Sequence, residues 1–219
     1  MYKHIIKRLI DLILSSVAII VLAFPMLIIA IAIKIDDSGP VLFKQKRVGK
    51  KKNGEITYFM IWKFRSMKMS TPHDTPTHLL ENPDQYITRV GRFIRKTSLD
   101  ELPQIYQVFT SKLSVIGPRP ALWSQEDLVA EREKYGANDI KPGITGWAQI
   151  NGRDELEIDV KAKFDGEYAT TLNAGKFKGF AMDVRCLVGT IISVLRSDGV
   201  VEGGTGEMKK KAEKETVEK

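Results

Sequence analysis

Two adjacent carboxylates, Asp100 and Glu101, lie in an arginine-rich part of the sequence. Arg89 and Arg92 precede the pair, and Arg119 follows it. A carboxylate held against a phosphoryl group can attack its phosphorus and form an acyl phosphate. Guanidinium groups bind phosphate oxygens strongly, often through two parallel hydrogen bonds. These residue types, so close together, favour phosphoryl-transfer chemistry at Asp100.

The same two acids also suit the start of a helix. Ser98 and Glu101 match the S-x-x-E capping box, which predicts a helix from Ser98 to about Phe109. In one interpretation the acids only stabilise this helix end through its macrodipole. In the other, the helix end binds a phosphate, and nearby cations keep Asp100 ionised.

Glu101 is the candidate ligand for a divalent cation. A second carboxylate beside a nucleophile can hold Mg²⁺ on phosphate oxygens. A carboxylate that closes a capping box is not fully free to bind a metal, so the two roles of Glu101 compete. Lys63 and Arg65 add two cations to the candidate site.

A predicted helix at Ile87–Lys96 places Arg89, Arg92 and Arg95 on one face, because they are spaced at i, i+3 and i+6. This face could bind a polyanion, or it could be an ordinary solvated helix surface. Spacing alone leaves both interpretations open.

Composition excludes several other classes of protein. A single cysteine, Cys186, excludes an internal disulfide framework and a Cys-rich zinc site, and three histidines leave little room for a His-based metal centre. The sequence has no Walker A loop, dinucleotide fingerprint, H-E-x-x-H or G-x-S-x-G motif. With 43% hydrophobic and 28% charged residues, the chain is neither disordered nor a polytopic membrane protein.

The positive charge is concentrated near the N-terminus. The formal net charge is +7, and residues 1–54 carry ten Lys and Arg against three Asp and Glu. Aromatic residues do not interleave with the basic run Lys44–Lys52, so we do not expect nucleic-acid binding. A basic segment of this kind is typical of proteins at an anionic membrane surface.

The segment Leu12–Ile33 has no ionisable side chain over 22 residues. As one helix it would be about 33 Å long, against a hydrocarbon core of about 30 Å. A signal peptide is disfavoured, because its apolar region is only about 7–15 residues long. Basic residues flank both ends of the segment, and the positive-inside rule therefore favours both ends in the cytoplasm.

Pro25 divides this apolar segment and predicts a bend, since proline removes a backbone N–H and clashes with the carbonyl of Val21. A re-entrant hairpin explains the basic flanks but exposes backbone groups to lipid. A kinked spanning helix avoids that cost but places one basic flank outside. The residues alone leave both alternatives open.

The rest of the chain indicates an α/β fold that is mostly helical, with a small β element. Val41–Phe43 and Ile56–Trp62 are predicted strands on either side of a basic turn. Phe177–Leu195 is an amphipathic helix that suits either a protein core or a bilayer interface. We divide the chain into a membrane anchor (1–36), a catalytic domain (37–202) and a flexible charged tail (203–219).

Several long motifs, in a fixed order, now indicate a family. The chain resembles the bacterial sugar transferases, the monotopic phosphoglycosyl transferases, from about Lys7 to Gly199. The motifs are Lys63-Phe64-Arg65-Ser66-Met67, Thr97-Ser98-Leu99-Asp100-Glu101-Leu102-Pro103-Gln104, Gly117-Pro118-Arg119-Pro120 and Lys141-Pro142-Gly143-Ile144-Thr145-Gly146-Trp147-Ala148-Gln149-Ile150-Asn151-Gly152-Arg153. The chain departs from the family's usual pattern in three places. Phe24 precedes Pro25 where serine is frequent, Gln107 replaces asparagine, and the segment Ser111-Lys112-Leu113-Ser114 replaces Gly-Asp-Met-Ser.

The resemblance implies transfer of a sugar phosphate from a UDP-sugar to undecaprenyl phosphate, with release of UMP. By this resemblance Asp100 is the nucleophile, Glu101 supports Mg²⁺, and Arg119 holds the nucleotide sugar. Weaker substrate contacts are implied for Lys63, Arg65, Arg89 and Arg92.

The resemblance also implies a re-entrant N-terminal helix and an active site on the cytoplasmic face of the bacterial inner membrane. The lipid product would pass to downstream glycosyltransferases, and 219 residues suggest the minimal catalytic form. A homodimer stays open, because the apolar C-terminal helix suits a dimer or a bilayer. The alternative function is a non-catalytic, membrane-tethered module that binds anionic lipids or a partner glycosyltransferase through Lys44–Lys52.

Overall fold

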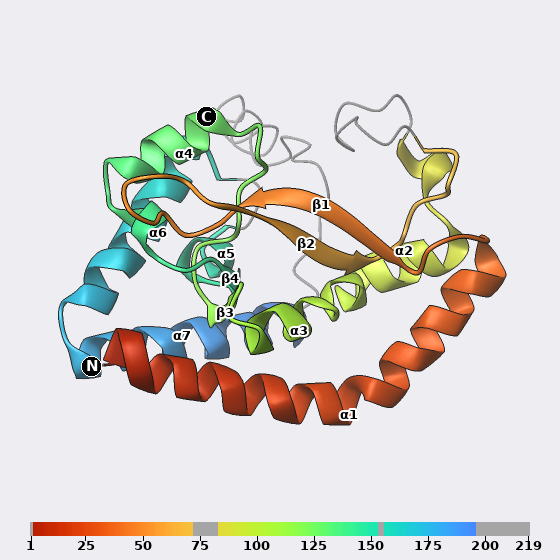
Figure 1. Cartoon of the computed structure of the whole chain (residues 1–219), viewed down its shortest axis with the longest axis horizontal. Coiled ribbons are helices and arrows are strands. Elements are labelled where there is room, and N and C mark those ends of the chain that lie inside the picture. The colour runs from red at the N-terminus through yellow and green to blue at the C-terminus, as the bar shows by residue number, and fades with distance from the viewer. Residues whose placement is uncertain (1, 72–82, 153–155, 196–219) are drawn as a thin grey trace, which may run out of the picture.

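Helices dominate the computed structural model of the chain, which describes residues 2–71, 83–152 and 156–195 (Figure 1). In chain order the elements are α1 (Lys7–Asp36, after a π-helical turn at Tyr2–Ile6), β1 (Leu42–Val48), β2 (Tyr58–Phe64), α2 (Arg89–Lys96), α3 (Gln104–Phe109), β3 (Ser114–Ile116), α4 (Glu126–Glu133), β4 (Gly143–Thr145), α5 (Trp147–Ile150), α6 (Ile158–Asn173) and α7 (Lys176–Leu195). The expected mostly helical α/β fold with a small β element is confirmed. The predicted tail at 203–219 lies outside the described residues.

β1 and β2 form an antiparallel hairpin, in a register from Leu42 opposite Phe64 to Val48 opposite Tyr58. The prediction ended the first strand at Phe43, but β1 continues through the basic residues that follow. The Lys46 ammonium lies 4.5 Å from the centre of the Tyr58 ring on the neighbouring strand. Such cation–π contacts let lysine side chains pack on an exposed sheet face, so the strand extends into the sequence that looked like a turn.

β3 and β4 pair in parallel. Their pairing brings Gly117-Pro118 next to Pro142-Gly143. Ser114 lies opposite Gly143 in this ladder. A Cβ atom on Gly117 would lie 2.4 Å from the Lys141 carbonyl oxygen, and one on Gly143 would lie 2.2 Å from the Gly117 nitrogen. Only glycine permits this close approach of the two backbones. The contact fixes the Pro-Arg-Pro turn, which follows Gly117.

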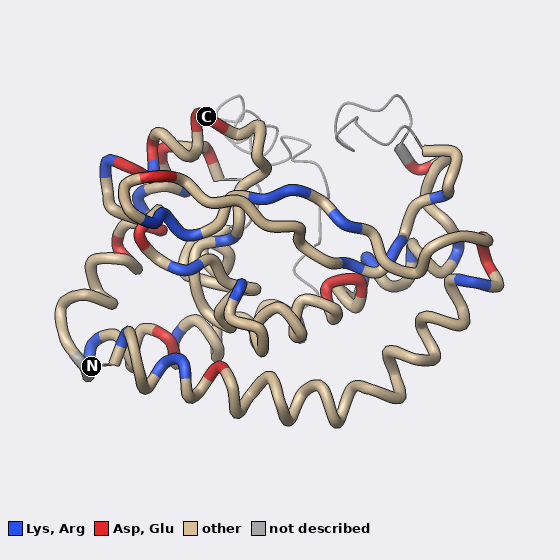
Figure 2. The backbone as a smooth tube through the Cα atoms, viewed as in Figure 1, with Lys and Arg blue, Asp and Glu red and all other residues tan. Residues whose placement is uncertain are grey.

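α1 is one continuous helix with Pro25 inside it, and it curves around the rest of the molecule, so that its middle lies farthest from the other elements (Figure 1). Figure 2 shows no charged residue along this bent part. Ile20 is 77% exposed and Phe24 is 71% exposed, although both are apolar. The helix Tyr2–Asp36 is long and apolar enough to cross a membrane. Its most apolar stretch of 18 residues has a mean hydropathy of 2.9, and 17% of that stretch is buried in the protein.

Both arms of α1 are attached to the same body. In the N-terminal arm, the Lys7 ammonium donates to the Asp183 carboxylate of α7 at 2.7 Å, and the Val115 N–H donates to the Asp11 carboxylate at 2.9 Å. In the C-terminal arm, Ile29 and Ile33 join a buried apolar cluster with residues of β2 and α2. The exposed bend therefore lies between two anchored arms.

α7 turns its apolar stripe outward. Phe177 is 80% exposed and Ile191 is 52% exposed, and the other large apolar residues of the stripe that the structure describes are also exposed. The buried face instead carries Asp183 and Cys186. Of the two alternatives left open by the sequence, a core helix is therefore wrong for this stripe.

Candidate active site

Asp100 and Glu101 lie on a 3-10 turn, Leu99–Glu101, directly before α3. Figure 2 shows this acidic turn in red between the hairpin and α1. Leu99 and Leu102 pack into the cluster formed by the C-terminal arm of α1, β2 and α2. This packing fixes the turn from both sides of the acidic pair.

The predicted capping box is wrong. Ser98 adopts a left-handed conformation (φ 56°, ψ 17°), and its side chain makes no capping hydrogen bond. Glu101 instead binds two cations from distant parts of the chain. This resolves the competition at Glu101 that the sequence predicted, since its carboxylate does not serve the helix end.

Lys63 and Arg119 both contact the Glu101 carboxylate. The Lys63 ammonium lies 2.9 Å from Oε1, and Nη2 of Arg119 lies 2.7 Å from the same oxygen. Burial raises the pKa of Glu101, but Arg119 and Lys63 outweigh burial and hold this pKa well below its ordinary value. Glu101 is therefore ionised throughout the physiological range.

Asp100 is buried, with 6% of its surface exposed. Its Oδ2 lies 3.7 Å from the Lys63 ammonium. Burial raises the pKa of Asp100, and the neighbouring Glu101 carboxylate adds to this, while Lys63, Arg95 and Arg119 lower it. The net direction is upward, so burial and Glu101 outweigh the cations that the sequence led us to expect beside Asp100. Two adjacent carboxylates thus have pKa values displaced in opposite directions, which is typical of catalytic sites.

A second, buried ion pair holds the turn that carries Arg119. Nη2 of Arg132 donates to the Arg119 carbonyl oxygen at 3.0 Å and to Oδ2 of Asp165 at 2.5 Å. Sequence reasoning missed both Arg132 and Asp165, because each lies in a helix whose charges look like a solvated surface. Their separation of 33 positions leaves no local signal.

The remaining predicted site residues lie elsewhere. The Arg65 guanidinium binds the Asp37 carboxylate and donates to the Pro40 carbonyl oxygen at 2.7 Å. Arg89 and Arg92 are exposed on α2 and have no hydrogen bond or ion pair to the acidic turn among the contacts of the described residues.

Arg95, the third member of that predicted face, is buried rather than exposed. Burial lowers the pKa of its guanidinium, and the Asp100 carboxylate opposes this change. Arg95 therefore acts on the acidic turn from inside the protein. Its i, i+6 spacing from Arg89 was visible in the sequence, but its inward direction was not.

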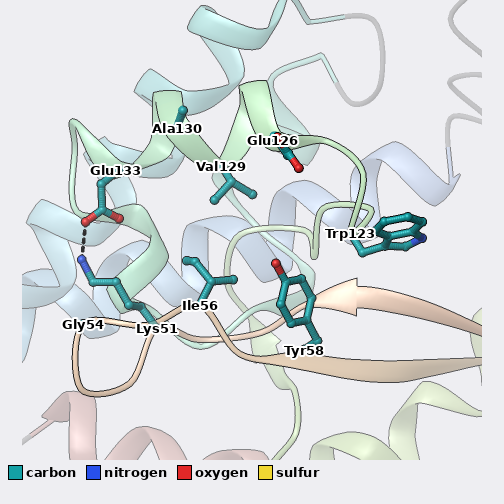
Figure 3. A pocket seen from close by; sticks show the side chains of 9 residues that line it. All are labelled: Lys51, Gly54, Ile56, Tyr58, Trp123, Glu126, Val129, Ala130 and Glu133. Carbon is teal, nitrogen blue, oxygen red and sulfur yellow. Dashed lines mark hydrogen bonds and ion pairs between the residues drawn. The ribbon is translucent and has the colours of Figure 1, made fainter.

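A separate pocket of about 270 Å³ lies between the turn of the hairpin and α4. Its lining includes Tyr58, Trp123 and Val129, and Figure 3 shows the ion pair of Lys51 with Glu133 at its edge. None of the predicted site residues lines it. The candidate chemistry therefore lies at the acidic turn and not in this pocket.

The geometry suits a reaction at a phosphorus atom. Asp100 supplies an oxygen nucleophile, and the cations beside it can bind phosphate oxygens. Among the described residues, no three or more His, Cys, Asp or Glu side chains gather as a metal site. A Mg²⁺ ion that arrives with a substrate needs only one or two protein carboxylates, because phosphate oxygens and water complete its shell. Oε1 of Glu101 is already paired with Lys63 and Arg119, whereas Oε2 has Nη1 of Arg119 at the longer distance of 3.4 Å, so Oε2 is the Glu101 atom that could join such a shell.

Comparison with known proteins agrees with this chemistry. Residues 2–197 match the bacterial sugar transferase family. The chain is 38% identical over 179 residues to a protein of Escherichia coli K12 named UDP-glucose:undecaprenyl-phosphate glucose-1-phosphate transferase, and this match covers 76% of the chain but 36% of that relative. It is 33% identical over 211 residues to the undecaprenyl-phosphate galactose phosphotransferase of Salmonella typhimurium, covering 90% of the chain and 42% of the relative.

A shorter relative matches along most of its length. The sugar transferase EpsL of Bacillus subtilis, which is named as uncharacterized, is 38% identical over 200 residues, and the match covers 90% of both proteins. The chain thus spans about a third of the Escherichia coli relative and nearly all of the Bacillus one. The family match over residues 2–197 and these relatives together show that the chain belongs to the bacterial sugar transferase family.

Proposed function

We propose that the protein transfers a sugar 1-phosphate from a UDP-sugar to undecaprenyl phosphate and releases UMP. The single observation that carries this proposal is the buried Asp100 carboxylate beside Lys63, next to a Glu101 carboxylate that is paired with Arg119. The names of the relatives support the lipid acceptor and the UDP-linked donor.

The first step is attack of an Asp100 carboxylate oxygen on the β-phosphorus of the UDP-sugar. The bond from that phosphorus to the oxygen bridging the two phosphates breaks, and UMP leaves with the electron pair. Asp100 must be ionised to attack, and its burial keeps the carboxylate poorly solvated and reactive. Lys63 and Arg119 would stabilise the negative charge that develops on the phosphate oxygens.

The second step regenerates the enzyme. An oxygen of the undecaprenyl phosphate attacks the same phosphorus, and the bond to Asp100 breaks. The product is the sugar linked to the lipid through a diphosphate. Glu101 would hold Mg²⁺, and this ion would supply electrostatic stabilisation of the negative charge on the leaving UMP.

The shape of α1 supports a monotopic position on the cytoplasmic face of the inner membrane. Both arms of α1 are anchored to the same body, which supports an arrangement in which the exposed apolar bend would enter the bilayer from one side and return to that side. The outward stripe of α7 would lie in the interface beside it. A lipid phosphate at headgroup depth and a water-soluble nucleotide could then both reach Asp100.

Release of UMP tests the proposed function. The protein, in detergent or nanodiscs, is incubated with undecaprenyl phosphate and each of several UDP-sugars, and an Asp100→Asn variant serves as the control. We expect UMP release with at least one donor and none from the variant. The alternative of a non-catalytic, membrane-tethered binding module predicts no UMP release with any donor.

A further inference from the structure

Gln107 is a buried side chain of α3 that binds the free edge of β2. The Trp62 N–H donates to Oε1 of Gln107 at 2.9 Å, and Nε2 of Gln107 donates to the Met60 carbonyl oxygen at 2.6 Å. Gln107 is 1% exposed. β1 pairs along the other edge of β2, so the glutamine amide binds a donor and an acceptor of β2 that point away from β1.

These two hydrogen bonds act on the residue that contacts the acidic turn. Lys63 directly follows Trp62 in β2, and its ammonium lies 2.9 Å from Glu101 and 3.7 Å from Asp100. The acidic turn Leu99–Glu101 is followed, after two residues, by α3, which carries Gln107. One side chain therefore ties the strand that carries the cation to the segment that carries the two carboxylates.

The backbone of Gln107 is itself held in place. Its carbonyl oxygen accepts hydrogen bonds from the N–H groups of Lys112 at 2.9 Å and Leu113 at 3.0 Å. Leu113 is fully buried. A side chain on so fixed a backbone can set the position of a neighbouring strand, and reacting groups lose up to about 100-fold in rate when they move by about 1 Å.

We propose that Gln107 is a positioning residue that sets the place of Lys63 against Asp100 and Glu101. The proposal rests on the proposed function for its catalytic consequence, but not for its effect on the contact between Lys63 and Glu101. Asparagine is one methylene shorter than glutamine, so α3 would have to lie closer to β2 for an asparagine amide to bind Met60 and Trp62 in the same way.

The test is a double-mutant cycle between Gln107→Leu and Lys63→Met, measured in the free energy of unfolding, which needs no substrate. If Gln107 holds Lys63 against Glu101, Lys63→Met should destabilise the Gln107→Leu variant less than it destabilises the wild type. Gln125→Leu is the matched control, since it removes another glutamine bond to a backbone N–H, at Leu122, and its effect should simply add to that of Lys63→Met.

A second variant guards against loss of the fold. Gln107→Asn keeps a buried amide and should show the same coupling to Lys63→Met by a smaller amount. Additive effects of a folded Gln107 variant and Lys63→Met on the free energy of unfolding would overturn the proposal. In the activity assay, Gln107→Leu should lower kcat for UMP release and cause no further loss in the Lys63→Met background. If the wild type releases no UMP from any donor, the proposed function fails, while the unfolding cycle still decides the role of Gln107.

Discussion

Replacing Lys63 with methionine is expected to move the acid limb of the activity profile to higher pH. Methionine has a similar length but no charge. The Lys63 ammonium lies 3.7 Å from Asp100 Oδ2 and lowers the pKa of a carboxyl that burial raises. Without the ammonium, the ionised form of Asp100 loses that attraction, so a higher pH is needed to produce the nucleophile.

The distance gives the size of the shift. At 3.7 Å the Coulomb attraction is about 4.5 kcal/mol for an effective dielectric constant of about 20, and about 1 kcal/mol in bulk water. The pair lies between these limits, because the Asp100 side chain is 9% exposed and that of Lys63 is 18% exposed. One pKa unit corresponds to about 1.4 kcal/mol, so the acid limb should move by about 1 to 3 pH units.

The assay is kcat/KM for UMP release measured from acid to neutral pH. Lys63→Met should also lower kcat/KM at every pH, since Lys63 would contact the donor phosphates, but the position of the acid limb is a separate reading. Lys52→Met, on the exposed turn of the same hairpin, is the matched control and should leave the profile unchanged. A uniform loss of activity with the acid limb in place would refute the assignment of Asp100 as the group that titrates.

Two further predictions concern the anchoring of α1 and the metal. Asp183→Asn should destabilise the fold by about 3–5 kcal/mol in denaturant unfolding, because it leaves the buried Lys7 ammonium without its carboxylate. Asp159→Asn, which breaks an exposed pair with Lys163, should change stability by less than about 1 kcal/mol. A chelator should abolish UMP release, and added Mg²⁺ should restore it, because an ion held by Glu101 would stabilise the negative charge of the leaving UMP.

Contrary outcomes are equally clear. Equal stability of the Asp183→Asn and Asp159→Asn variants would show that the network at the N-terminal arm does not anchor α1. Full activity in excess chelator would remove Mg²⁺ from the mechanism and leave Glu101 with only its pairing to Lys63 and Arg119.

Local patterns in the sequence located the elements but not their partners. The acidic pair and the Pro-Arg-Pro turn both stood out in the sequence, because carboxylates and arginines lie close together there. The capping box failed because Lys63 and Arg119, 38 and 18 positions away from Glu101, compete for its carboxylate and outweigh a local hydrogen bond. Spacing in the sequence cannot predict that these two distant cations bind Glu101.

Periodicity has a similar limit. It found the apolar stripe of α7, but a stripe that faces a bilayer and one that faces a core have the same spacing. Arg95 shows the converse, since its spacing placed it with the exposed Arg89 while the packing of α2 turns it inward. Gln107 was noticed as a change from asparagine, but its two bonds to β2 depend on how α3 packs on the hairpin.

Intact-protein mass spectrometry tests the central claim most directly. The wild-type protein is incubated with a UDP-sugar that supports UMP release, without undecaprenyl phosphate, and then digested to locate any adduct. We expect a mass increase of one phosphosugar on the peptide that contains Asp100, its disappearance when the lipid acceptor is added, and no increase in Asp100→Asn. An unmodified wild type that still forms product when the acceptor is present would contradict a covalent intermediate on Asp100.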